Sequence, residues 1–239
     1  MKFYDFHIQG EDTYADELLI SEAKRLNFDG VCVFYKNDYD QCKSNLKKIS
    51  IKLNKSSDNN KFNIYSGLKV LSKNPEELRK TILKNYNKAD ILMVCGGDLK
   101  INRAACENPK IDILSRPYYK RKDSGMNHVL AKEAKRNNVT VELCLRDLIK
   151  TKGHIRAKTI SHFRDILILS NKFKFNIIIT TGAKTIYDLR TPKDMLALIK
   201  SLGLSQNEAE KTLSSTPNLL IKNSYDKHNI IVNGVKKLN

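Results

Sequence analysis

The sequence lacks several features that would assign it to a class of protein at once. It has no apolar run of about 18 residues, so we expect no transmembrane helix. Its first ten residues contain an acid and a histidine instead of a basic stretch followed by an apolar one, which argues against a secretory signal. The five cysteines include no C-x-x-C pair, and such a set indicates a reducing compartment. These absences predict a cytoplasmic protein without a membrane partner.

Short motifs that hold nucleotides, nucleophiles or metals are also missing. There is no G-x-G-x-x-G, no G-x-x-x-x-G-K-S/T and no G-x-S-x-G, so neither a nucleotide-binding loop nor a serine nucleophile is indicated. No two of the five histidines lie at H-x-H or H-x-x-x-H spacing. The motifs therefore predict neither a cofactor nor a metal site.

Acidic residues are scarce relative to basic ones, with 26 Asp and Glu against 43 Lys and Arg and a formal net charge of +17. Such a field attracts polyanions, above all nucleic acid. Eight of the ten arginines lie between residues 99 and 193, whereas lysine is spread over the whole chain. Because the guanidinium fork suits phosphate, this concentration favours nucleic-acid binding. A protein-interaction scaffold with an incidental, solubilising lysine surface is the alternative.

Short apolar runs alternate with amphipathic helical patterns along the chain. The predicted strands are rich in Val, Ile and aromatic residues and cover residues 3–8, 31–35, 62–70, 91–95, 111–114, 139–143 and 176–180. About seven βα units in series predict an α/β protein with a TIM-like (β/α) barrel, and an open doubly wound sheet is the alternative. We assign residues 1–205 to the barrel domain and 206–239 to a C-terminal helix and tail, expected to be partly disordered beyond residue 216.

Cations follow four successive predicted strands within a few residues of each strand end. The loops after the carboxyl ends of parallel strands gather on one rim of a barrel, where helix N-termini also offer free N–H groups to phosphate. We therefore predict a phosphate-binding rim. Its cations are Arg103 after the fourth strand, Arg116 and residues 120–122 after the fifth, Arg146 after the sixth, and Lys184 and Arg190 after the seventh.

Each of these residues also has a purely structural interpretation. Arg103 and Arg146 could form ion pairs with Asp98 and Asp147, and the basic run at 120–122 could be a solvated surface. The tyrosines at 118–119 could stack on an unpaired base or simply cover the rim. The convergence of four loops is a stronger indication than any single residue.

His7 tests whether the chain is an enzyme. Barrel phosphoesterases of the polymerase-and-histidinol-phosphatase type open with an H-x-H pair that ligates a metal, but here the second position is Gln9, a poor ligand. His7 with Asp5 and Glu142 could still form a remnant metal site. A metal-dependent phosphoesterase or nuclease is therefore the alternative function, although a lone histidine in a strand is more often a hydrogen-bonded core residue.

Several segments, taken in order, resemble the archaeal ribonuclease P protein component 3 family, which is related to a human ribonuclease P subunit. The similarity extends from the first strand to about residue 203 and is densest between residues 96 and 194. No single motif decides it, but their order and combination are specific. The segments are GGD at 96–98, NRAA at 102–105, RP at 116–117, GMNH at 125–128, LRDL at 145–148, FRDIL at 163–167, TGAK at 181–184, YDLR at 187–190 and PKD at 192–194.

The resemblance implies a metal-free relative of the barrel phosphoesterases that serves the complex removing 5′ leaders from precursor tRNA. In that family the RNA is the catalyst, so the chain itself would hold no catalytic residue. Its implied partners are ribonuclease P RNA, precursor tRNA in the holoenzyme, protein component 2 and other ribonuclease P proteins. The residues that the resemblance marks as RNA contacts are Arg103, Arg116, Arg121, Arg146, Arg156, Lys158, Arg164, Lys184, Arg190 and Lys193.

Overall fold

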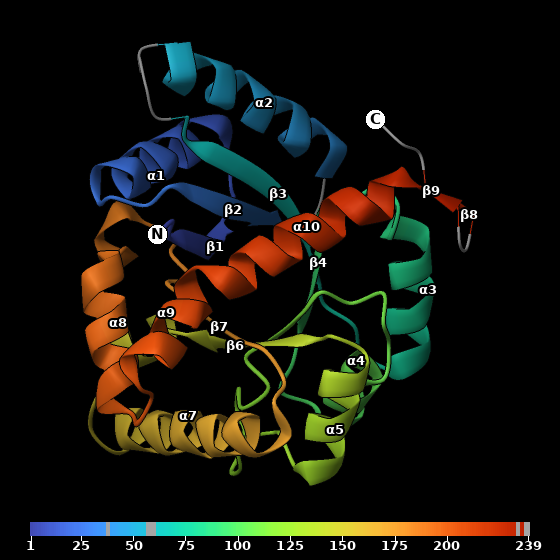
Figure 1. The fold of residues 1–239 in the computed structure, drawn as a ribbon, viewed down its shortest axis with the longest axis vertical. Coiled ribbons are helices and arrows are strands. Elements are labelled where there is room, and N and C mark those ends of the chain that lie inside the picture. The colour runs from blue at the N-terminus through green and yellow to red at the C-terminus, as the bar shows by residue number, and fades with distance from the viewer. Residues whose placement is uncertain (37–38, 56–60, 233–234, 237–239) are drawn as a thin grey trace.

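Seven parallel strands form one sheet, and strands that are neighbours in the sequence are neighbours in the sheet (Figure 1). The computed structural model describes residues 1–36, 39–55, 61–232 and 235–236. A bridge between Ile8 and Ala183, with the Gln9 N–H donating to the Ala183 carbonyl at 2.8 Å, brings the end of the sheet back to its start. The predicted TIM-like barrel is confirmed. The alternative of an open doubly wound sheet is wrong, because such a sheet reverses its strand order.

The predicted strands are all present, and their ends lie within two residues of those expected. The strands are β1 (Tyr4–Gln9), β2 (Gly30–Tyr35), β3 (Asn63–Val70), β4 (Ile91–Cys95), β5 (Ile113–Ser115), β6 (Thr140–Cys144) and β7 (Ile177–Thr180). A separate antiparallel pair is formed by β8 (Ile230–Val232) and β9 (Val235–Lys236).

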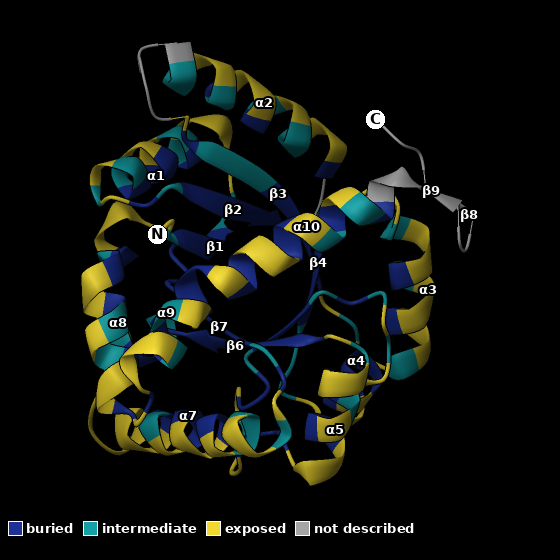
Figure 2. Ribbon diagram, viewed as in Figure 1, coloured by how far each residue is buried: buried dark blue, intermediate teal, exposed yellow. Residues whose placement is uncertain are grey.

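Helices follow the strands and cover the outside of the barrel, with their buried faces inward and their exposed faces outward (Figure 2). Asn74 caps α3 by accepting the Glu77 N–H, and Ser205 forms a capping box at α9, as their spacing predicts. The helices are α1 (Thr13–Arg25), α2 (Tyr39–Lys55), α3 (Pro75–Asn85), α4 (Leu99–Cys106), α5 (His128–Arg136), α6 (Arg146–Ile149), α7 (Gly153–Phe173), α8 (Pro192–Ser201), α9 (Gln206–Leu213) and α10 (Ser215–Asn229), with the short 3₁₀ helix η1 (Ile186–Asp188).

The core has two parts because the parallel strands are buried on both faces. The larger cluster lies between the strands and the surrounding helices. The smaller one fills the barrel interior with side chains such as Phe6, Phe34 and Met93, together with Leu220 and Ile221 of α10. The described helices include none long and apolar enough to cross a membrane.

Helix α10 runs across the end of the barrel where the strands begin (Figure 1). Its Lys227 donates to the carbonyl of Asp90, which precedes β4, and lies 3.8 Å from the carboxylate of Asp112, which precedes β5. Residues 216–229 are helical, which their few helix signals did not predict, and the expectation of a partly disordered tail stays a prediction. Burial of Leu220 and Ile221 in the barrel stabilises a segment whose own helix signals are weak. The division of the chain at residue 205 stays a prediction.

Candidate nucleic-acid interface

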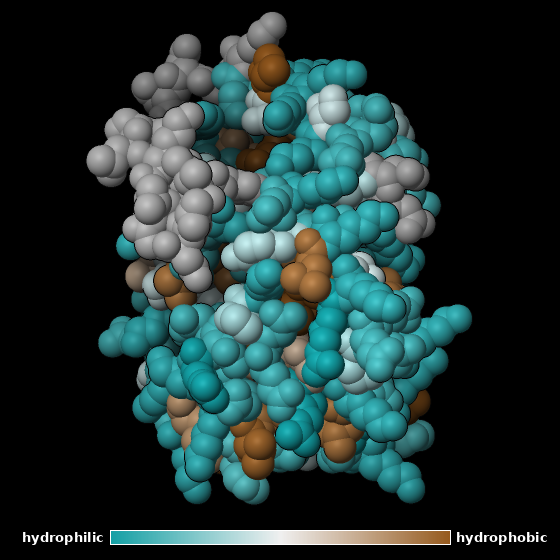
Figure 3. Space-filling view, turned by 90° about the vertical axis from the view of Figure 1, so that its right-hand side faces the viewer, coloured by the Kyte–Doolittle hydropathy of each residue, from teal (hydrophilic) through white to brown (hydrophobic). Residues whose placement is uncertain are grey.

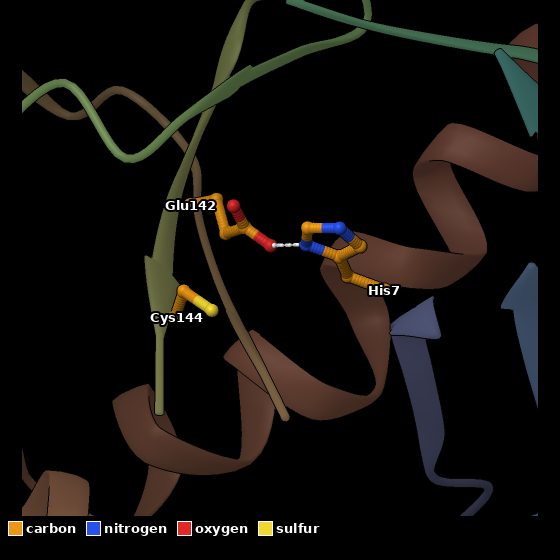
Figure 4. A group of neighbouring side chains, drawn as sticks. All are labelled: His7, Glu142 and Cys144. Carbon is orange, nitrogen blue, oxygen red and sulfur yellow. Dashed lines mark hydrogen bonds and ion pairs between the residues drawn. The ribbon is translucent and has the colours of Figure 1, made fainter. Parts of the chain in front are cut away.

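A buried polar chain crosses the barrel interior near its open mouth. His7 on β1 lies with its Nδ1 2.5 Å from Glu142 Oε1 on β6, as Figure 4 shows. Its Nε2 lies 3.0 Å from the Nζ of Lys69 on β3. Because an ammonium group can only donate, Nε2 is the acceptor and Nδ1–H donates to Glu142. Burial lowers the pKa of His7, so the imidazole is neutral and links a cation to an anion.

Both carboxylate oxygens of Glu142 accept hydrogen bonds. Besides His7, Thr180 Oγ1 donates to Oε1 at 2.6 Å and the Ser115 hydroxyl donates to Oε2. Burial alone would raise the pKa of Glu142, but the hydrogen bonds from His7, Ser115 and Thr180 outweigh it and hold the pKa below its ordinary value. Glu142 is therefore a charged and saturated acceptor rather than an acid or a base available for catalysis.

Asp5 does not join His7 and Glu142, although the sequence suggested this set. Its carboxylate accepts hydrogen bonds from the backbone N–H of Thr181 at 3.1 Å, from the Thr181 hydroxyl and from the His7 N–H at 3.3 Å. Burial raises the pKa of Asp5 to about 6, although these hydrogen bonds lower it. Asp5 thus holds the loop after β7 against β1.

The donor set at the mouth fits a divalent cation poorly. One nitrogen of His7, one oxygen of Glu142 and the sulfur of Cys144 lie within 4.8 Å of one another, as a metal would need. However, both ring nitrogens of His7 are engaged, and the Lys69 ammonium stands 3.0 Å from the outer one. A second cation there would meet direct repulsion. These contacts do not favour the alternative of a metal-dependent phosphoesterase.

Arg116 and Arg146 lie on the rim of the barrel, in the segments that directly follow β5 and β6, at the same end as His7, Glu142 and Lys69. Arg116 adopts a left-handed backbone with a φ of 53°, and its Nε donates to Asp147 at 2.7 Å while a second nitrogen binds the other oxygen. Its guanidinium also lies 4.0 Å from the centre of the Tyr119 ring. Arg146 Nε lies 3.5 Å from Asp188. Both arginines are thus tied to acids from neighbouring loops.

The predicted ion-pair partners of Arg103 and Arg146 are wrong. Asp98 is the N-cap of α4, where it accepts the N–H groups of Lys100 and Ile101, and Arg103 instead binds Glu107 at 2.7 Å along its own helix. Asp147 is taken by Arg116 rather than by its neighbour in the sequence. The ion pairs between sequence neighbours do not form, because Asp98 already accepts the N–H groups at the start of α4 and Asp147 binds an arginine from the loop after β5.

The sequence left open whether Tyr118 and Tyr119 stack on a base or cover the rim, and the structure distinguishes the two residues. Tyr118 is buried, donates to Asp147 at 2.8 Å and accepts the N–H of Cys144, so it covers the rim. Tyr119 is 41% exposed, with the Nζ of Lys120 5.5 Å from its ring centre and Arg116 on the ring as well. Tyr119 is the one of the two that is available to a base.

The remaining cations differ in exposure, and the side chain of Arg121 is 19% exposed, less than those of Arg116 and Arg146. Arg121 binds Asp123 at 2.6 Å, and Arg190 donates to the carbonyls of Tyr187 and Leu189. Among the described residues, the other five predicted contacts have no acidic partner within ion-pair distance, and all five are exposed. These five are Arg156, Lys158, Arg164, Lys184 and Lys193.

The topology brings most of the predicted contacts to the loops after the strands and the first turns of the following helices. Arg164 is the exception, since it lies on the exposed side of α7 about 16 Å along the helix from Gly153 at 1.5 Å per residue. Figure 3 shows the side of the molecule that carries α3, α4 and α5 as mainly hydrophilic, with only scattered hydrophobic spots. The part of this side that the figure describes therefore presents no large apolar patch.

Lys69 was missed by the sequence reasoning. It lies inside a run that was assigned to a strand, and nothing distinguished it there from a surface lysine on an edge. The signal that could have found it is its position between Leu68 and Val70, because a lysine in a strand buried on both faces must point into the barrel or into the helical layer.

Residues 2–229 match the family model described as RNase P subunit p30. The chain belongs to this ribonuclease P subunit family. It is 43% identical to ribonuclease P protein component 3 of Methanothermobacter thermautotrophicus, over 100% of this chain and 96% of the relative. It is 37% identical to the protein of the same name from Methanococcoides burtonii, over 98% of this chain and 93% of that one. The resemblance stated from the sequence is confirmed.

A solved structure agrees with the family assignment. The fold matches a chain in the cryo-EM structure of archaeal ribonuclease P with mature tRNA, with a TM-score of 0.82, 31% identity and coverage of 99% of this chain and 98% of that one. A Xaa-Pro dipeptidase also matches, with a TM-score of 0.58 at 10% identity over 94% of this chain and 76% of the enzyme. The second likeness concerns the barrel fold alone.

Proposed function

We propose that this chain is an RNA-binding protein subunit of ribonuclease P that assists the catalytic RNA in removing the 5′ leader from precursor tRNA. Its 43% identity over the full chain to ribonuclease P protein component 3 carries the proposal. The chain is a family member from end to end, so the assignment does not rest on one shared segment. Its proposed partners are ribonuclease P RNA, precursor tRNA in the holoenzyme, protein component 2 and the other ribonuclease P proteins, in the cytoplasm.

The interior of the barrel agrees with a supporting role. Glu142 is buried in the barrel and accepts hydrogen bonds from His7, Ser115 and Thr180. A general base or acid must reach the proton that it transfers, and this carboxylate is 0% exposed. In the proposal, the RNA performs the cleavage and the protein supplies positive charge.

The predicted RNA contacts differ in how freely they can bind phosphate. An exposed cation without an acidic partner gives its full charge to phosphate, whereas an arginine bound to a carboxylate must share it. We therefore rank the five exposed residues without an acidic partner above Arg116, Arg121 and Arg146. Arg103 belongs between these groups, because its pair with Glu107 lies on the helix surface, where water screens it.

Salt dependence of binding to ribonuclease P RNA tests this proposal. If about six phosphates are neutralised, log affinity should fall with log salt at a slope of roughly −4 to −5. Replacing Arg103, Arg146 and Lys184 together by alanine should make the slope shallower by about two to three and weaken binding. Unchanged affinity in a folded triple variant would refute the site assignment.

A charge-matched triple provides the control. Lys47, Lys48 and Lys80 are exposed on α2 and α3, away from the loops that follow β4 to β7. Replacing them by alanine removes the same formal charge, so any effect of net charge alone appears in both triples. The proposal expects a clearly smaller loss of affinity in this control, with the melting temperatures of both variants measured alongside.

A further inference from the structure

The mouth of the barrel, the end where the strands finish, contains a cavity of about 360 Å³ beside β1, β2 and β3. Three lysines line it: Lys36 directly after β2, Lys69 on β3 and Lys184 after β7. Among the described residues, Glu11 is the single acid in the lining. Since one water takes up about 30 Å³, the cavity has room for a phosphate group and several waters. Its charge and size thus suit a small oxyanion.

Lys69 is the central feature of this cavity. The residue is 7% exposed, and in the described part of the chain its Nζ has one hydrogen-bond partner, the neutral His7. An ammonium group has three donors, and burying it with donors unused costs free energy. The remaining donors of Lys69 thus have no partner among the described residues, and Lys69 is one of the residues that line the cavity. An anion in the cavity would satisfy them and offset the burial.

The charge on the opposite side of His7 does not neutralise Lys69 directly. Glu142 is the nearest countercharge along this chain of contacts, and the whole imidazole separates it from the ammonium. Other cations reach the same mouth, since Lys69, Arg116 and Lys36 all oppose the rise in the pKa of Cys95 that burial and Glu142 cause at the end of β4. The open side of the cavity is therefore electropositive on several strands at once.

We propose that the barrel mouth is a phosphate-binding site, with Lys69 as the central ligand and Lys36 and Lys184 beside it. The ligand class is a phosphate group, either free or as part of an ester. The site is distinct from the rim that carries Arg116 and Arg146, because its main residue, Lys69, is buried in the barrel wall. It can be tested without any assumption about the RNA partner, since inorganic phosphate alone is the probe.

Titration of the full chain with inorganic phosphate, followed by calorimetry at constant ionic strength, tests the site. We expect saturable binding that Lys69→Met weakens about tenfold or more, because it removes a charge-assisted hydrogen bond, and that Lys184→Met weakens less. Lys48→Met, an exposed lysine of α2, is the matched control and should bind as the unaltered chain does. Absence of saturable binding, or equal affinity in Lys69→Met, would overturn the proposal.

Lys69→Met leaves His7 Nε2 without its donor and could fail to fold. In that case Lys36→Met and Lys184→Met decide, because Lys36 and Lys184 are exposed and their replacement leaves the buried contacts intact. Weaker phosphate binding in both supports the site. Unchanged phosphate binding in both overturns it.

Competition with short oligoribonucleotides identifies the source of the phosphate. Stronger displacement of inorganic phosphate by a 5′-phosphorylated strand than by the same strand with a 5′-hydroxyl supports a terminal phosphate of RNA. Equal displacement by the two strands supports backbone phosphodiesters. Displacement by neither, with phosphate binding intact, supports free phosphate as the ligand.

Discussion

The two ends of the barrel each bury one lysine, but they surround it differently. At the end where the strands begin, Lys227 of α10 lies 3.8 Å from the carboxylate of Asp112 and donates to the carbonyl of Asp90. At the mouth, the Nζ of Lys69 has one hydrogen-bond partner among the described residues, the neutral ring of His7. The first lysine is neutralised within the protein, whereas the second keeps donors and charge for an external anion. Similar burial therefore serves structure at one end and binding at the other.

The residues around the two lysines also differ, being apolar at the closed end and polar at the mouth. Helix α10 closes its end with apolar side chains, and Leu220 is only 1% exposed in the barrel interior. The mouth instead holds Asp5, His7 and Glu142, all buried and all hydrogen-bonded. Packing should dominate the stability of the closed end, while protonation should govern that of the mouth.

The largest effect is expected from a substitution that disrupts the packing of α10 at the closed end. Leu220→Ala should lower the free energy of unfolding by about 3 to 4 kcal/mol, because it leaves a cavity where α10 packs into the barrel. Chemical denaturation measures this loss. Leu219→Ala is the matched control: Leu219 is 38% exposed and precedes Leu220 on the same helix, so its replacement should cost far less. Equal losses in the two variants would show that α10 does not close the barrel.

A smaller effect is expected at the mouth, and it depends on pH. Burial raises the pKa of Asp5 to about 6 from an ordinary value of 3.8, so its contribution to stability is present below pH 4 and is lost as the pH rises through 6. Asp5→Asn removes this titration. Relative to the unaltered chain, the variant should gain on the order of 2 kcal/mol between pH 4 and pH 7.

Denaturation of both proteins at the two pH values checks the Asp5 prediction. Any loss of hydrogen bonds on substitution cancels in the comparison, because it is present at both pH values. A difference between variant and unaltered chain that is the same at pH 4 and pH 7 would mean that Asp5 ionises as easily in the fold as in water.

The sequence predicted the barrel well because its strands are buried on both faces. The β4 run Ile91–Cys95 and the β7 run Ile177–Thr180 are almost wholly apolar, and such runs are visible without any knowledge of tertiary contacts. Helix α10 escaped prediction because its stability comes from the barrel that it closes. Its own sequence is rich in Ser, Asn and Lys, and only the packing of its apolar side chains reveals the helix.

The assignment of the RNA contacts stays a prediction, whereas part of the geometry around them was visible in the sequence. His7 and Glu142, named from the sequence with Asp5 as a possible remnant metal site, do meet across the barrel, but Asp5 does not join them. The partners were harder to foresee, because Arg116 reaches Asp147 over 31 residues and Asp188 binds both Arg146 and Lys150. Which acid each arginine meets depends on loop geometry, such as the left-handed backbone at Arg116, that a single sequence does not display.

Precursor-tRNA cleavage tests most directly whether the barrel serves a catalytic RNA. The assay compares ribonuclease P RNA alone, the RNA with this chain and protein component 2, and this chain alone with Mg²⁺ or Mn²⁺. We predict no cleavage by the chain alone and faster cleavage by the RNA when both proteins are present. Cleavage by the chain alone that requires the metal and disappears in His7→Ala would contradict the account.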